Sequence, residues 1–253
     1  MLGAIAGDVI GSPYEHAPIK SKDFDLFNRY SVFTDDTVLS LAVAQSLLDT
    51  SPYQENFRGF FLHYPNAGYG GRFRRWARSP LPKPYGSFGN GSAMRVSPIA
   101  WFYDDLDKVM EEALHSAEVT HNHPEGVKGA QAVAIAIFMA RHGSSKPRIK
   151  SVLEDRFGYD LSYSLDQIRP EYQFEVSCQN SVPQGIISFL ESTDFEDAVR
   201  NAVSLGGDSD TLACIAGGIA EAYYGGVPDG IAEQTLSRLD DRLKSVYLAF
   251  QRR

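Results

Sequence analysis

The sequence contains few cysteines and no long apolar run. Its two cysteines, Cys178 and Cys214, cannot make a disulfide framework, and they suit a reducing compartment such as the cytoplasm. The longest apolar run near the middle of the chain spans residues 132–140, whereas a membrane-spanning helix needs about 20 residues. The first residues lack a basic segment and reach Asp8 early, so we expect neither a secretory signal nor a membrane span.

Positive charge is also scarce. The chain has 24 Lys and Arg against 32 Asp and Glu, a formal net charge of −8. Such a protein is poorly suited to hold phosphate backbones through bulk charge, so we expect no general binding to DNA or RNA. With 43% apolar residues among 253, the composition predicts a globular protein with a substantial core. We expect one domain over residues 1–253 and favour a monomer.

The spacing of apolar residues is helical along almost the whole chain, and no strand-rich region interrupts it. We therefore predict an all-α fold, a compact domain of many helices that cross at steep angles. Gly3, Gly7 and Gly11 lie four residues apart on one face of the first helix, a spacing that lets a neighbouring backbone come close. Later helices are expected over 35–48, 92–101, 183–190, 209–224 and 229–250, and an irregular segment over 158–178.

Two acidic clusters each stand at the start of an apolar helix: Thr-Asp-Asp-Thr at 34–37 and Gly-Gly-Asp-Ser-Asp-Thr at 206–211. One interpretation is helix capping, with Thr34 and Asp208 as N-caps. The other is a divalent cation site, because Asp carboxylates and Thr hydroxyls are oxygen ligands that Mg²⁺, Mn²⁺ or Ca²⁺ accepts. Neither cluster can fill six coordination positions alone, so this interpretation requires the two clusters to meet in space.

Two further segments are candidates for ligand binding. The glycine-rich stretch 85–95 can expose backbone N–H groups to a phosphate or diphosphate, or it can be an ordinary connector. Its spacing matches neither the dinucleotide-binding nor the P-loop motif. Within it, Phe88 can stack on a nucleobase or pin the loop to the core. Glu15 follows the first helix through a turn and can reach into a cleft, although it can equally be an exposed loop acid.

Histidine and arginine add two weaker signals. The segment His-Asn-His-Pro-Glu at 121–125 lacks a third zinc ligand at the usual spacing, so a histidine that hydrogen-bonds a ligand is favoured over a zinc site. The arginines at 72, 74, 75 and 78 form a short basic stretch. It is interpreted as a solvated face, with contact to a diphosphate as the alternative.

Five segments taken together resemble the ADP-ribosylglycohydrolase family, and they occur in the family's order. They are GAIAGDVIGSPYE, FTDDTVLSLAVAQSLL, YGSFGNGSAMR, VTHNHPEGVKGA and SLGGDSDTLACIAGGIAEAYYG. The resemblance runs over about residues 1–226. The family includes the dinitrogenase reductase-activating glycohydrolases and the eukaryotic ADP-ribosylhydrolases. It implies an all-α fold with two divalent cations, Mg²⁺ or Mn²⁺, in a cleft.

The resemblance also implies roles for individual residues. The metal ligands that it implies are Thr34, Asp35, Asp36, Asp208, Asp210 and Thr211. The catalytic carboxylate that handles the attacking water would be Glu15 or Asp36. The residues implied to bind ADP-ribose are Gly86, Ser87, Phe88, Gly89, Asn90, Gly91 and His121.

The implied reaction is hydrolysis of the bond at C1″ of ADP-ribose attached to an acceptor, with arginine of a protein favoured, releasing ADP-ribose. Two other functions remain open. One is a metal-dependent phosphohydrolase acting on a nucleotide diphosphate, which would release AMP and ribose phosphate. The other is a protein that binds ADP-ribose without cleaving it.

Overall fold

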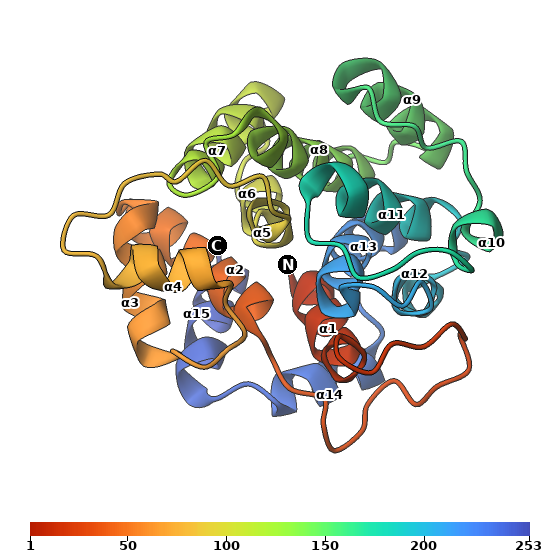
Figure 1. The fold of residues 1–253 in the computed structure, drawn as a ribbon, viewed down its shortest axis with the longest axis horizontal. Helices are drawn as coiled ribbons and strands as arrows, with labels where there is room; N and C mark the ends of the chain where they lie inside the picture. The colour runs from red at the N-terminus through yellow and green to blue at the C-terminus, as the bar shows by residue number, and fades with distance from the viewer.

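The computed structural model describes residues 1–253 and contains helices but no sheet, so the predicted all-α class is confirmed (Figure 1). The helices are α1 (Leu2–Gly11), the 3₁₀ helix η1 (Ser12–Tyr14), α2 (Asp35–Asp49), α3 (Tyr53–His63), α4 (Gly71–Arg78), α5 (Gly91–Met94), α6 (Ser97–Phe102), α7 (Leu106–Glu118), α8 (Pro124–Arg141), α9 (Lys146–Phe157), α10 (Leu165–Ile168), α11 (Cys178–Leu190), α12 (Phe195–Val203), α13 (Ser209–Tyr224), α14 (Asp229–Ser237) and α15 (Asp241–Gln251). None of them combines the length and apolar character needed to cross a membrane.

Helices α1 and α13 form the centre of the fold, and both are buried along most of their length. They run in opposite directions, because Gly3 faces Gly217 while Gly11 faces Ser209. A Cβ atom on Gly7 would lie 2.0 Å from the carbonyl oxygen of Ala213. The expected close approach of a neighbouring backbone is therefore confirmed, and it places the end of α1 beside the start of α13.

This contact leads to a prediction about stability. Gly7→Ala is expected to lower the free energy of unfolding by about 2 kcal/mol or more, because overpacking a rigid interior costs about 1–3 kcal/mol. Gly59 in α3 is the matched control, since a Cβ atom there meets nothing within 4 Å. Gly59→Ala is expected to raise the free energy of unfolding by about 0.5–1 kcal/mol. Urea denaturation of both variants measures the difference, and equal effects would contradict the close contact.

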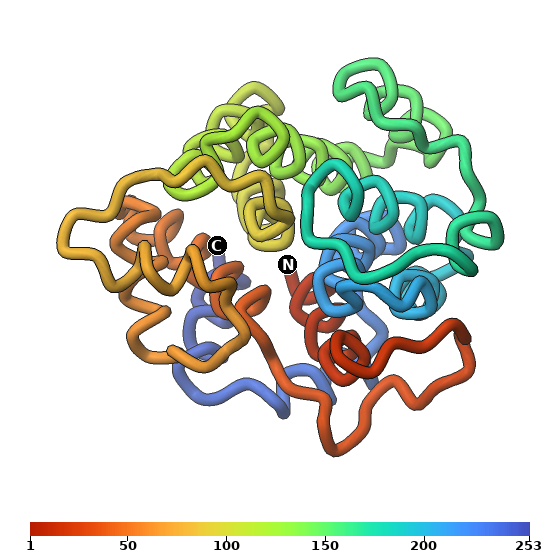
Figure 2. Tube along the Cα trace, viewed as in Figure 1, coloured from red at the N-terminus to blue at the C-terminus, as the bar shows by residue number.

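Long irregular segments run over the outside of the helices (Figure 2). The segment between α1 and α2 makes a wide excursion, and the segment from 158 to 177 contains only the short α10, as the sequence predicts. The end of this second segment lies against the glycine-rich stretch. The Asn90 N–H donates to the Val176 carbonyl at 2.7 Å, and the Cys178 N–H donates to the Phe88 carbonyl at 2.8 Å. These hydrogen bonds hold the glycine-rich stretch in place through residues that lie far from it in the chain.

Three predicted helix boundaries are wrong. The helix expected at 183 begins at Cys178 and includes Pro183 in its interior, so the carbonyl of Gln179 receives no helical hydrogen bond from residue 183. The helix expected over 229–250 is split into α14 and α15, because the Asp240 carboxylate accepts from the Leu243 N–H at 2.9 Å and starts a new helix. The helix expected over 92–101 is likewise two short helices, α5 and α6.

Candidate active site

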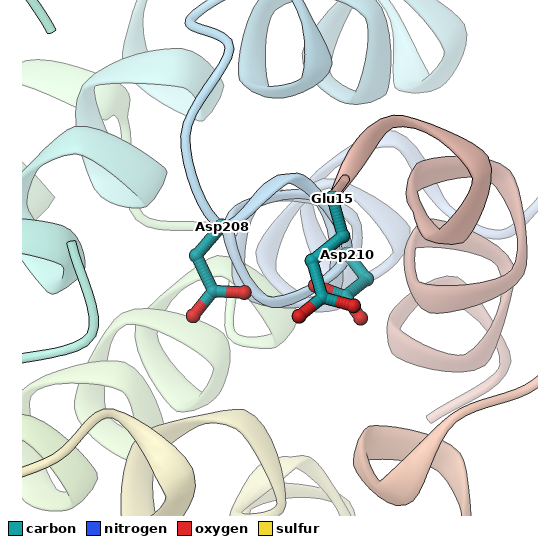
Figure 3. A group of neighbouring side chains, drawn as sticks. All are labelled: Glu15, Asp208 and Asp210. Atoms are coloured by element: carbon teal, nitrogen blue, oxygen red, sulfur yellow. The ribbon is translucent and has the colours of Figure 1, made fainter. Parts of the chain in front are cut away.

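The two acidic clusters meet in one cleft with a volume of about 420 Å³. Its acidic lining consists of Glu15, Asp35, Asp36, Asp208 and Asp210, with Thr211 beside them. One carboxylate oxygen each from Glu15, Asp208 and Asp210 lies within 4.8 Å of the others. Figure 3 shows these three carboxylates turned to the same side, Glu15 from the end of the first helical segment and the two aspartates from the start of α13. The geometry that a shared cation site requires is therefore present.

Asp8 holds the start of α2 in this position. Its buried carboxylate accepts hydrogen bonds from the Thr34 N–H at 2.9 Å and from the Thr34 hydroxyl at 2.7 Å. It also accepts from the Thr37 N–H at 3.0 Å and from the Thr37 hydroxyl. These bonds join α1 to the first turn of α2, so Asp35 and Asp36 lie in the cleft as a consequence of contacts made by their neighbours.

Capping accounts for Thr34 but not for the aspartates. The Thr34 hydroxyl accepts from the Asp36 N–H at 3.3 Å, the N-cap bond expected from the sequence. Asp208 also stands at an N-cap position, yet its side chain caps nothing. Instead it accepts from the Asn90 side-chain amide at 2.7 Å. The glycine-rich loop thus orients an acidic side chain of the cleft.

The cleft concentrates negative charge in a buried setting. Burial first, and the charge of Asp210 second, raise the pKa of Asp36 well above its ordinary value. The same two causes raise the pKa of Asp35 and of Asp208. They also raise the pKa of the half-buried Glu15. Like charges gathered this closely repel unless protons or cations neutralise them.

The donor set fits divalent cations. The buried Asp36 Oδ1 has no hydrogen-bond partner, whereas Oδ2 accepts from the Thr211 hydroxyl at 3.4 Å. A buried carboxylate oxygen without a donor is costly, and a cation removes that cost. The carboxylates and the Thr211 hydroxyl supply oxygen ligands, the type that Mg²⁺ or Mn²⁺ prefers. The side chains present therefore fit the metals that the sequence implies.

A second region of the same cleft is positive. Arg72 and Arg95 are the only cationic side chains of Lys or Arg type in its lining, and His121 lies with them. Arg95 is fully buried and donates to the Ser116 carbonyl and the Thr120 hydroxyl, so Arg72 is the cation that a ligand can reach. Burial first, and then the charges of Arg95 and Arg72, lower the pKa of His121 well below its ordinary value. The His121 imidazole is therefore neutral at pH 7 and can donate or accept a hydrogen bond. The cleft combines an acidic region with a region suited to an anion.

The structure places most of the expected substrate-binding residues in the cleft. Of that set, Ser87, Gly89, Asn90, Gly91 and His121 belong to its lining. Gly86 does not, and its N–H donates to the Asn122 side chain at 2.7 Å. Phe88 is exposed and meets the edge of His123 with ring centroids 5.4 Å apart. Thr34 also lies outside the lining, since its hydroxyl is engaged by Asp8.

Several residues of the site have no role in the sequence-based prediction. Asp8 holds the start of α2. Its position as the one charged residue inside an otherwise apolar helix is a sequence signal that could have indicated a structural role. Gly68 adopts a φ of +108°, and a Cβ atom there would lie 2.8 Å from Asp35 Oδ1, so this glycine makes room for the carboxylate. Phe174 lines the cleft, and nothing in its local sequence indicates this; Tyr85 lines it as the first residue of the glycine-rich stretch.

Comparison with known proteins agrees with this geometry. The family model described as ADP-ribosylglycohydrolase matches residues 1–252. The chain is 27% identical to the "ADP-ribosylhydrolase ARH3" of Homo sapiens, over 89% of this chain and 84% of that protein. It is 25% identical to the "ADP-ribosylarginine hydrolase Tri1" of Pseudomonas putida (strain GB-1), over 89% of this chain and 69% of that protein.

A solved structure supports the same relationship. The "ADP-ribosylglycohydrolase-related protein complex" superposes with a TM-score of 0.73 at 26% identity, and covers 99% of this chain and 96% of that chain. The fold, the family match over nearly every residue and the acidic cleft agree, and this chain belongs to the ADP-ribosylglycohydrolase family of enzymes.

Proposed function

We propose that this protein is a metal-dependent hydrolase that cleaves the bond at C1″ of ADP-ribose attached to an acceptor, with ADP-ribosyl-arginine of a protein as the substrate. The observation that carries the proposal is the division of one cleft into an acidic region and a region with arginine and histidine. ADP-ribose has matching parts, because its distal ribose offers a diol for cations and its diphosphate carries negative charge.

We assign the metals to Asp35, Asp36, Asp208, Asp210 and Thr211, with Thr34 retained from the sequence-based set. Divalent cations in this site would lower the pKa of water and hold sugar hydroxyl groups. Asn90 keeps Asp208 turned toward the cleft through its 2.7 Å hydrogen bond. The diphosphate would lie near Arg72 and His121, against the backbone of Ser87, Gly89 and Gly91.

Glu15 is the preferred acid–base residue. It is half-buried, it lines the cleft, and one of its carboxylate oxygens stands within 4.8 Å of Asp208 and Asp210. Asp36 is almost fully buried and bonded to Thr211, which suits a ligand better than a proton carrier. In the proposed reaction Glu15 takes a proton from water as the water oxygen bonds to C1″, and the bond from C1″ to the guanidine nitrogen breaks. The departing guanidine then takes that proton from Glu15 and leaves as arginine.

Arginine is the favoured acceptor on electrostatic grounds. Its guanidinium group is positive, and the five carboxylates of the cleft outnumber the four positive charges that two divalent cations would bring. The name of the Pseudomonas putida relative, ADP-ribosylarginine hydrolase, refers to the linkage between ADP-ribose and arginine. A cytoplasmic location and a monomeric state remain predictions; both cysteines are free and buried.

A substrate panel tests the proposal. Purified protein is incubated with ADP-ribose attached to arginine, to serine and to acetate, in Mg²⁺, in Mn²⁺ and in EDTA. We expect free ADP-ribose from the arginine conjugate, and no product in EDTA. Formation of AMP and ribose phosphate would establish a phosphohydrolase instead. Binding of ADP-ribose with no product in either metal would establish a binding protein.

A further inference from the structure

A second cavity of about 250 Å³ adjoins the active-site cleft at α4. Arg72 and Tyr85 line both cavities, so the two lie side by side. The Arg72 guanidinium lies over the Tyr85 ring at 4.9 Å from its centroid and donates to the Tyr85 carbonyl. We refer to this second cavity as the α4 groove; the rest of its lining is Arg75, Trp76, Ser79, Pro82 and Lys83.

The α4 groove is positively charged in an acidic protein. Three of its lining residues, Arg72, Arg75 and Lys83, are cations, and no carboxylate lines it. None of these three side chains takes part in an ion pair within the protein. In a chain of net charge −8, a group of unpaired cations in a concave site favours an anionic ligand.

Trp76 supplies an independent observation. It is 4% exposed, and its indole Nε1 has no hydrogen-bond partner. A buried N–H donor without an acceptor is costly, and such groups are normally paired with protein, water or a ligand. Because Nε1 is itself buried, the donors that the α4 groove offers to an oxyanion such as phosphate are Arg72, Arg75 and Lys83.

The proposed function indicates which part of the substrate reaches this groove. If the distal ribose lies at the carboxylates and the diphosphate lies at Arg72, the adenosine continues past Arg72, where the α4 groove begins. We propose, resting on that function, that the α4 groove binds a phosphate monoester on the adenosine ribose. This protein would then prefer substrates built on 2′-phosphorylated ADP-ribose over those built on ADP-ribose.

Titration calorimetry with the two free ligands tests this. Wild-type protein is expected to bind ADP-ribose 2′-phosphate about tenfold more tightly than ADP-ribose. Arg75→Ala and Lys83→Ala are each expected to remove most of that preference while leaving the affinity for ADP-ribose unchanged. Trp76→Phe keeps an aromatic ring and removes only the buried N–H, so it is expected to keep the preference.

Arg148→Ala is the matched control, because Arg148 is an exposed cation of α9, away from both cavities. This variant is expected to keep the full preference. Equal affinity of the wild type for both ligands, or a preference that survives both Arg75→Ala and Lys83→Ala, would overturn the groove proposal and leave the proposed function intact. Failure of both ligands to bind would overturn the proposed function itself.

Discussion

Asp210→Asn is expected to abolish hydrolysis, with a loss in kcat/KM of at least about a thousandfold. Asp210 is the residue whose charge acts on the largest number of its neighbours: it raises the pKa of Asp8, Asp35 and Asp36 among others. It also lies with Glu15 in the group of carboxylates that approach within 4.8 Å. Replacing its carboxylate by an amide removes one negative ligand from the centre of the proposed metal site.

The same substitution is expected to leave the metal-free protein as stable as the wild type or more stable. Removing one of several like charges from a buried cluster relieves repulsion, while the amide keeps the volume of the side chain. Activity is therefore expected to fall while stability does not, and this combination distinguishes a defect of the site from a defect of folding. Asp107→Asn makes the same chemical change on the exposed face of α7 and is expected to alter neither.

Mg²⁺ titration gives the deciding measurement. A ligand that binds only the folded state stabilises it, by about 2.7 kcal/mol at 100 times its Kd. Wild-type protein is expected to show this rise in Tm with Mg²⁺, and Asp210→Asn is expected to lose most of it. Near-normal turnover by Asp210→Asn, or an equal rise in Tm for both proteins, would contradict the proposed site.

The sequence could predict the parts of the molecule whose signal is local. Helix α13 follows from its apolar spacing, and the glycine face of α1 from the spacing of Gly3, Gly7 and Gly11. The acidic composition of the cleft also follows, because both clusters consist of short oxygen-bearing side chains at helix starts. The metal interpretation requires the two acidic clusters to meet in space. Glu15 reaches Asp210 because α1 packs closely on α13.

The sequence could not predict contacts between segments far apart in the chain. The bond from Asn90 to Asp208 joins residues 118 positions apart, and no local pattern specifies it. The entry of Arg72 into the cleft depends on how α4 packs, which the local sequence does not specify, so the basic stretch allows both interpretations. The pattern predicts a helix start at Pro183, because proline favours the first turn of a helix. Tertiary packing overrides this local preference, and the helix begins at Cys178.

Asp8→Ala is expected to lower the free energy of unfolding by about 3 kcal/mol and to remove most activity. The carboxylate accepts from the backbone N–H and the hydroxyl of both Thr34 and Thr37, and alanine leaves these buried donors unpaired at about 1–3 kcal/mol for each uncompensated group. Burial first, and the charge of Asp210 second, raise the pKa of Asp8 to about 7. Removing this buried carboxylate therefore offsets part of the cost. Several lost hydrogen bonds outweigh one relieved repulsion.

Asp8→Asn distinguishes a positioning role from a direct catalytic one. The asparagine oxygen can still accept from the Thr34 or Thr37 N–H, and its amide can donate to a threonine hydroxyl, so urea denaturation is expected to show recovery of most of the lost stability. Asp8 does not line the cleft, so this variant is also expected to recover most of kcat. The remaining defect is expected to be weaker use of Mg²⁺, seen as an increase in the Mg²⁺ concentration that gives half of the maximal rate. The reason is that the first turn of α2 positions Asp35 and Asp36. A fully stable Asp8→Asn protein with no activity at saturating Mg²⁺ would instead place Asp8 among the residues that act directly in the reaction.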